Sequence, residues 1–290
     1  MRPLLMAVLA AALSTALPGP GMAQQPAPPS QDLPEALLGT YASGAEGCKD
    51  GAFVVQVTPR SVVTMRMAGE NRLMRVAATD VLGGWTVATG TGEDMPRVLL
   101  RTAGEGAGSG IEHLVPAAKL TDDQLPGPGT PVRLLPCAGL PPALAVLHGE
   151  GLALLHALET MEPACTAGPL QACLDAFMVY ADLNRDGKLN VAELSRTVRG
   201  ATWLAQMSAG TEAGPLAEGA GAALLGGLAA AEVLVRSFDF DGQGTITPQQ
   251  LMRDRLPVEL RPQPRGRAAA PLELERIVPQ LGALKGLLGL

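Results

Sequence analysis

Oxygen-bearing side chains recur at alternate positions of the segment 182–193, at spacings suited to a hard divalent cation. Calcium takes about six to eight oxygen ligands at roughly 2.3–2.6 Å, and alternate side chains of a tightly curled loop point inward to supply them. Gly187 permits the sharp turn, because glycine adopts a positive φ without steric cost. The expected ligands are the side chains of Asp182, Asn184, Asp186 and Asn190, both carboxylate oxygens of Glu193 and the backbone carbonyl of Lys188.

The order of these residues is similar to the metal-binding loop of EF-hand calcium-binding proteins, D-x-[DN]-x-[DN]-G-x5-E, with Leu189 at the apolar eighth position. The resemblance covers residues 169–256 at most, and it implies a helix on either side of the loop and Ca²⁺ as the cofactor. Apolar faces flank the loop as this requires, formed by Leu174, Phe177, Met178, Ala181, Leu194 and Val198. The alternative is an acidic turn that is exposed to solvent and binds no metal. Such a turn would not require the residue types of the loop pattern at so many positions.

The segment 239–250 repeats this layout with two departures. Gln243 replaces a short Asp or Asn, and Gln250 replaces the acidic residue that would give two oxygens at the twelfth position. With less negative charge, this loop should bind calcium weakly or not at all. We expect a structural loop that pairs with the first through Leu189 and Ile246. Its candidate ligands are Asp239, Asp241, Gln243, Thr245 and Gln250.

The stretch 209–215 between the loops predicts a flexible connector, followed by a helix from near Leu216. Residues 220–231 carry no charge and have small residues at four-residue spacing, as membrane-spanning helices do. Charged residues bound this stretch too closely to leave the roughly twenty apolar residues that a span needs. We therefore expect close packing inside a helical domain and no transmembrane span after signal removal.

Residues 1–23 have the pattern of a secretory signal peptide, with Arg2, an apolar run, and small residues before a cleavage point after Ala23. An uncleaved anchor is the alternative. A Pro- and Gln-rich leader, 24–35, is expected to be disordered. The excess of Arg over Lys, with abundant Ala, Gly and Pro, is typical of GC-rich bacterial genomes. We expect a bacterial protein that is periplasmic or secreted.

The chain has four cysteines, all after the expected cleavage point, which suits an oxidising compartment. Three pairings are open. We favour Cys48–Cys137, which would tie together the ends of a β-rich domain, and Cys165–Cys173, which would close a short loop before the segment 182–193. The cysteines lack CxxC spacing and the three histidines lie far apart, which argues against a zinc site.

The predicted fold class is α+β, with a small antiparallel β domain, barrel or sandwich, over 36–139 and an all-α EF-hand pair over 140–256. Seven short β-branched runs predict the strands: 53–58, 61–67, 72–78, 85–88, 97–101, 111–115 and 132–135. A Pro/Arg linker, 257–269, precedes an amphipathic helix over 270–290. We expect its apolar stripe to dock on the EF-hand region, with a partner or a membrane surface as alternatives: Leu274, Ile277, Leu281, Leu284 and Leu288.

No hydrolase, nucleotide-binding or metalloprotease motif is present, so we expect no enzyme. The net charge of −6 gives no reason to expect nucleic-acid binding. The sequence favours an exported, non-enzymatic calcium-binding protein, with a protein or envelope partner that binds through the EF-hand groove or the C-terminal helix. The alternative is a carrier or interaction protein whose β domain binds a small molecule or envelope component and whose calcium site is only structural.

Overall fold

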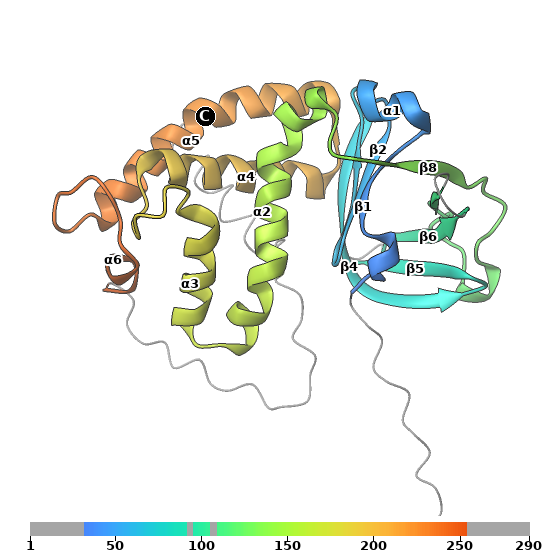
Figure 1. Cartoon of the computed structure of the whole chain (residues 1–290), viewed down its shortest axis with the longest axis horizontal. Coiled ribbons are helices and arrows are strands. Elements are labelled where there is room, and N and C mark those ends of the chain that lie inside the picture. Colours follow the sequence, from blue (N-terminus) through green and yellow to red (C-terminus); the bar gives the residue numbers. More distant parts are fainter. Residues whose placement is uncertain (1–31, 92–94, 105–108, 254–290) are drawn as a thin grey trace, which may run out of the picture.

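A computed structural model describes residues 32–91, 95–104 and 109–253 of the chain (Figure 1). The predicted signal peptide, most of the leader, the Pro/Arg linker and the C-terminal helix lie outside the described residues.

Eight antiparallel strands close into a barrel in the N-terminal half. The hydrogen-bonded order is β3-β2-β1-β8-β7-β6-β5-β4, and a further pairing of β3 with β4 closes the ring. Of the two predicted β architectures, the barrel is therefore correct. The strands are β1 (Gly39–Ala42), β2 (Val54–Thr58), β3 (Ser61–Met65), β4 (Glu70–Leu82), β5 (Trp85–Gly90), β6 (Arg97–Ala103), β7 (Gly110–Leu114) and β8 (Val132–Cys137).

The seven predicted strands correspond to β2 through β8, whereas β1 is too short to give a period-two signal. Short helical elements accompany the strands: η1 (Glu35–Leu37), α1 (Gly44–Asp50) and η3 (Asp122–Gln124). Apolar side chains fill the barrel interior, among them Val55, Val57, Val62, Val76, Leu100, Ile111 and Leu134. The interior is thus a packed core.

The C-terminal half is helical and lies against one side of the barrel (Figure 1). Its elements are α2 (Pro142–Ala167), α3 (Leu170–Ala181), α4 (Val191–Ala209), β9 (Thr211–Glu212), α5 (Ala213–Phe238) and α6 (Pro248–Arg253). Helix α2 spans 26 residues and includes Pro163.

The predicted all-α EF-hand pair is wrong as a fold class, because the helical half is neither all-α nor separate from the barrel. Residues of α2, α4 and α5 share one core with β2, β3 and β4. In β2 and β3, neighbouring side chains are buried on opposite faces: Val55 and Val62 point into the barrel, while Val54 and Val63 pack under the helices. The near-continuous apolar runs in these two strands reflect burial on both faces, as in sheets covered by helices.

The predicted flexible connector over 209–215 is also wrong. Thr211 and Glu212 form β9, which pairs antiparallel with Asn71 and Glu70 of β4, and α5 begins directly at Ala213. The backbone groups of the connector therefore bond to the sheet edge, which fixes the start of α5 against the barrel.

Both favoured disulfides are present. Cys48 in α1 is bonded to Cys137 at the end of β8, with 5.5 Å between their Cα atoms. Cys165 in α2 is bonded to Cys173 in α3, with a Cα separation of 4.4 Å. The second bond joins the two helices that lead into the segment 182–193.

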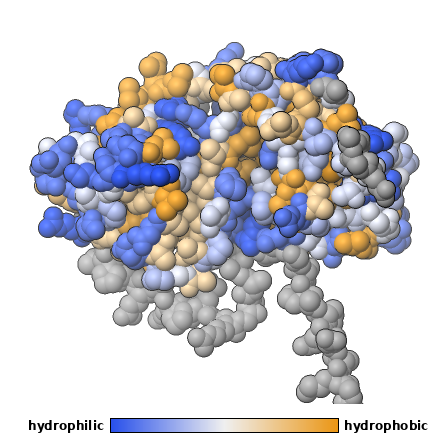
Figure 2. All heavy atoms as spheres, viewed as in Figure 1, coloured by the Kyte–Doolittle hydropathy of each residue, from blue (hydrophilic) through white to orange (hydrophobic). Residues whose placement is uncertain are grey.

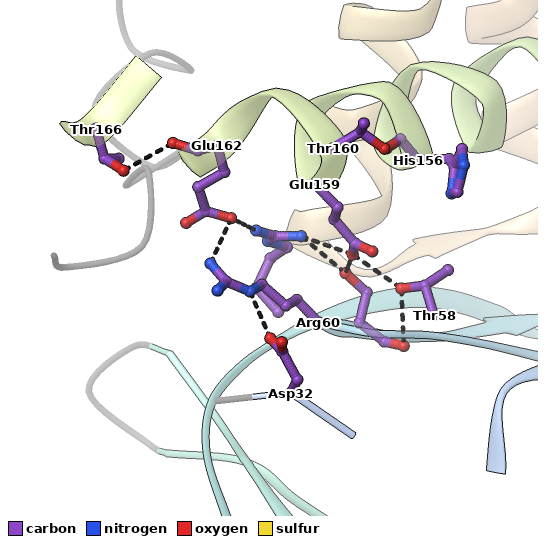
Figure 3. A network of polar contacts seen from close by, with 10 residues as sticks. Asp32, Thr58, Arg60, His156, Glu159, Thr160, Glu162 and Thr166 are labelled. Carbon is purple, nitrogen blue, oxygen red and sulfur yellow. Dashed lines mark hydrogen bonds and ion pairs between the residues drawn. The ribbon is translucent and has the colours of Figure 1, made fainter. Parts of the chain in front are cut away.

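Two glutamates on α2 attach this helix to the barrel through buried ion pairs (Figure 3). Arg75 of β4 places Nη1 2.8 Å from Glu159 Oε1 and Nη2 3.1 Å from Glu162 Oε2. Arg60, in the turn between β2 and β3, lies 3.0 Å from Glu162, and the Thr58 hydroxyl donates to Glu159 at 2.8 Å. We call these two glutamates and two arginines the α2 clamp, and they fix α2 relative to the strands.

Candidate metal centre

The first acidic loop, 182–193, connects α3 to α4, and the second, 239–250, connects α5 to α6. The two loops meet at their eighth positions, as expected from the sequence: Leu189 N donates to Ile246 O and Ile246 N to Leu189 O, each at 2.8 Å. Both side chains are buried in a small core with Ala181, Leu194, Ala231 and Val235. This shared core holds each loop against the other.

The backbone of the first loop turns sharply at two residues with positive φ. Gly187 has φ of 78°, which glycine adopts readily. Arg185 has φ of 60°, a conformation uncommon outside glycine. The sequence predicted the first of these and gave no signal for the second. The turn brings the backbone N–H groups of residues 186 to 188 over the acidic side chains.

Backbone hydrogen bonds then orient the side-chain oxygens of the loop. Asp182 Oδ1 accepts from Asp186 N at 3.1 Å and its Oδ2 accepts from Gly187 N at 2.8 Å. Asn184 Oδ1 also accepts from Asp186 N, at 3.0 Å, and Asp186 Oδ1 accepts from Lys188 N at 2.9 Å. Each of these oxygens retains a further lone pair, because an sp² oxygen accepts two hydrogen bonds or ligands.

Glu193 closes the loop from the first turn of α4. Its Oε1 accepts from Leu183 N at 2.8 Å and Asn184 N at 3.2 Å, and its Oε2 accepts from Asn190 N at 3.0 Å. Asn190 in turn caps α4 by accepting from Ala192 N and Glu193 N. Asn190 and Glu193 thus form a reciprocal capping box at the start of α4. Glu193 is thereby fixed across the loop from Asp182 and Asp186.

The first loop concentrates negative charge without a basic partner. Glu193 is only 5% exposed, and in the described part of the chain no Lys, Arg or His forms an ion pair with Asp182, Asp186 or Glu193. A buried carboxylate without a cationic partner is costly unless hydrogen bonds satisfy it, and Glu193 accepts three from backbone N–H groups. The carboxylate, amide and carbonyl oxygens of the loop are the kinds of donor that Ca²⁺ prefers.

Among residues 32–91, 95–104 and 109–253, no group of three or more His, Cys, Asp and Glu side chains is gathered as a metal cluster. The candidate site combines its three carboxylates with Asn184, Asn190 and the Lys188 carbonyl, which supply neutral oxygens.

In the second loop, backbone N–H groups bond to the carboxylate at the first position, as they do in the first loop. Asp239 accepts from Gln243 N and Gly244 N at 2.9 and 2.7 Å, and these N–H groups, Gly244 above all, lower the pKa of its carboxyl group. Gln250, at the twelfth position, accepts from Thr247 N through Oε1 at 2.7 Å and donates through Nε2 to Asp241 Oδ1 at 3.1 Å.

The Gln250 amide at the twelfth position therefore donates a hydrogen bond to Asp241 at the third position, and both positions supply metal ligands in a calcium-binding loop. The remaining candidate ligands of this loop are Gln243, which is exposed, and Thr245, which is half-buried.

Comparison with family models, curated proteins and solved structures finds no match to this chain. The functional argument for this site accordingly comes from its own residues.

Two features of the structure were not predicted from the sequence. One is the donor role of the Gln250 amide, since only the fold shows which end of the amide faces Asp241. The other is the α2 clamp. Its signal was available, because Glu159 and Glu162 lie one turn apart and so share a face of an otherwise apolar helix.

Proposed function

We propose that this chain is an exported, non-enzymatic calcium-binding protein that holds one Ca²⁺ in the loop 182–193. The contrast at the twelfth position carries this proposal: Glu193 is a buried carboxylate held by three neutral backbone N–H groups, whereas Gln250 adds no charge to the second loop and donates through its amide to Asp241. A divalent ion bound here would contact the carboxylates directly, whereas Arg185 and Lys188 of the same loop form no ion pair with Asp182, Asp186 or Glu193 among the described residues.

The ligands of the ion would be Asp182, Asn184, Asp186, the Lys188 carbonyl, Asn190 directly or through water, and Glu193. Because only three of these carry charge, we expect an affinity of about 10⁻⁵–10⁻³ M, in the range of weaker sensors and extracellular modules. The second loop, in this proposal, stabilises the first through the Leu189–Ile246 pairing without binding metal.

Two disulfides indicate an oxidising environment outside the reducing cytosol. We propose the periplasm or the exterior of a bacterium, on the basis of the signal-peptide pattern in residues 1–23. A protein or envelope component remains the proposed partner class.

The alternative class is a carrier or interaction protein whose β domain binds a small molecule or envelope component, and a small molecule enclosed by the barrel would require space inside it. The inward-facing side chains of the described strands fill that interior instead, with Val55, Leu100, Ile111 and Leu134 at most 1% exposed. This packing argues against a ligand held inside the barrel.

Calorimetric titration of the mature protein with Ca²⁺ tests the proposal. We expect one site per chain, and Glu193→Gln should remove the binding heat because it neutralises the twelfth position. Glu46→Gln, a change at an exposed residue of α1, is the matched control and should leave binding unchanged. The absence of binding in the wild-type protein, or unchanged binding in Glu193→Gln, would contradict the proposal.

A further inference from the structure

Helix α5 exposes an apolar face on the side away from the rest of the molecule. Leu225 is 78% exposed and Leu224 is 58% exposed, and Leu228 and Val233 are more than half exposed. Figure 2 shows hydrophobic side chains along the upper edge of the helical half, where α5 runs. Among the described residues, α5 is the one helix whose length and composition would allow it to cross a membrane, yet only 17% of its most apolar window is buried.

The opposite face of α5 is already used. Leu216, Gly227, Ala231 and Val235 are buried, and a Cβ added at Gly227 would come within 3.0 Å of Arg199 Cγ on α4. The sequence predicted close packing for residues 220–231, and the structure shows it for this one face only. A helix that is apolar all round is normally covered on both sides. We therefore expect a second segment or molecule to cover the outward face of α5.

The chain supplies a matching segment beyond α6. Helix α6 ends at Arg253, and its Leu251 packs in the cluster of Ala231 and Val235, at the C-terminal end of α5. The 16 residues from 254 to 269 span at most about 55 Å, whereas α5 with 26 residues is about 39 Å long, so residues 270–290 can reach the whole face. This segment has an apolar residue at every third or fourth position from Leu274 to Leu288.

The charged residues of α5 favour residues 270–290 over a membrane surface as the partner of the outward face. Helix α5 carries Glu218, Glu232 and Arg236, of which Arg236 pairs with Glu232, while helices that lie on anionic membranes are rich in Lys and Arg along the rim. Arg265 and Arg267 precede the apolar segment and complement Glu218. A tethered segment also has an effective concentration in the millimolar range, which a second copy of the chain does not reach.

We propose that residues 270–290 form a helix that packs on the outward face of α5 and covers Leu224, Leu225 and Leu228. A groove of about 390 Å³ between α2 and α3, lined by Ala153, Ala157, Met161, Ala176, Val179 and Tyr180 among others, is the competing location on this chain. The two locations are separated by variants on each.

Hydrogen exchange of the full mature chain, read on peptides that cover 270–290, tests the proposal. We expect protected amides in this segment in the wild-type protein, and a loss of at least about tenfold in protection in Leu225→Asp, because a carboxylate would be buried under the segment. Val146→Asp, at a 90% exposed position of α2, is the matched control and should leave the protection unchanged.

Any of the following results would overturn the proposal. Residues 270–290 could exchange freely in the wild-type protein, or their protection could persist in Leu225→Asp. Protection lost in Val179→Asp and kept in Leu225→Asp would place the segment in the α2/α3 groove. Protection that rises with protein concentration, or that requires vesicles containing phosphatidylglycerol, would assign the face to a second copy or to a membrane.

Discussion

Gln250 Nε2 donates a hydrogen bond to Asp241 Oδ1 across 3.1 Å, joining the twelfth and third positions of the second loop without a metal. The orientation of the amide is defined, because Oε1 accepts from Thr247 N on the other side. Glu193 occupies the same position in the first loop and cannot donate when ionised. The two loops thus differ at the twelfth position by one amide and one carboxylate, and only the first loop carries a negative charge there.

The first prediction is that Gln250→Glu converts the second loop into a calcium site. Without metal, the new carboxylate faces Asp241 and loses the hydrogen bond, so the protein should be destabilised by about 1–2 kcal/mol. Calorimetry should then give two calcium ions per chain, and calcium should restore the melting temperature. Gln249→Glu, at the exposed neighbouring position, is the control and should still bind one ion.

The second prediction concerns the α2 clamp. Glu159→Ala should lower the free energy of unfolding by about 3 kcal/mol, because it removes one partner from buried charges: the side chains of Glu159 and Arg75 are 4% and 10% exposed. Urea denaturation measures this effect. Glu46→Ala breaks an exposed pair with Lys49 and should cost less than about 1 kcal/mol. Equal effects of the two variants would show that the clamp does not stabilise the fold.

The third prediction is that stability falls between about pH 6.5 and pH 4 through buried histidines. Burial lowers the pKa of His148 to about 4, and burial together with the charge of Arg66 lowers the pKa of His113 to about 4. The folded state keeps these rings neutral while the unfolded state binds protons below its higher pKa, so their contribution is present above pH 6.5 and is lost as the pH falls through this window.

The expected slope is about 1.4 kcal/mol per pH unit for each histidine within this window. His148→Gln keeps an acceptor for the Trp203 Nε1–H, which now donates to His148 Nδ1 at 3.0 Å, and removes one titrating group. The slope measured by urea denaturation between pH 6.5 and pH 5 should therefore decrease. An unchanged slope in this variant would mean that His148 does not titrate on unfolding.

The fourth prediction ranks the two disulfides. On the chain-entropy model, the Cys48–Cys137 bond, which spans 89 positions, contributes about 4–5 kcal/mol, and the Cys165–Cys173 bond, which spans 8, contributes about 2–3 kcal/mol. Replacing each pair by serine should lower the urea midpoint in that order. A larger loss from the Cys165–Cys173 pair would show that its contribution comes from the geometry of α2 and α3 in the folded state.

The sequence by itself determined the features that depend on neighbouring residues. The oxygen donors of the loop 182–193, its turn at Gly187 and the cap at Asn190 follow from spacing within twelve residues. Most strands of the barrel follow from β-branched runs. The cysteine pairs followed from where the four residues lie relative to the predicted elements.

Only the tertiary structure decided what depends on distant segments meeting. Val54 and Val55 belong to different cores because helices cover the outer face of β2, and Thr211 pairs with β4 because α4 ends beside that edge. The burial of the Glu193 side chain is likewise a property of the folded chain. Whether a carboxylate is buried, and which hydrogen-bond donors or basic side chains reach it, is set by the packing of the whole chain.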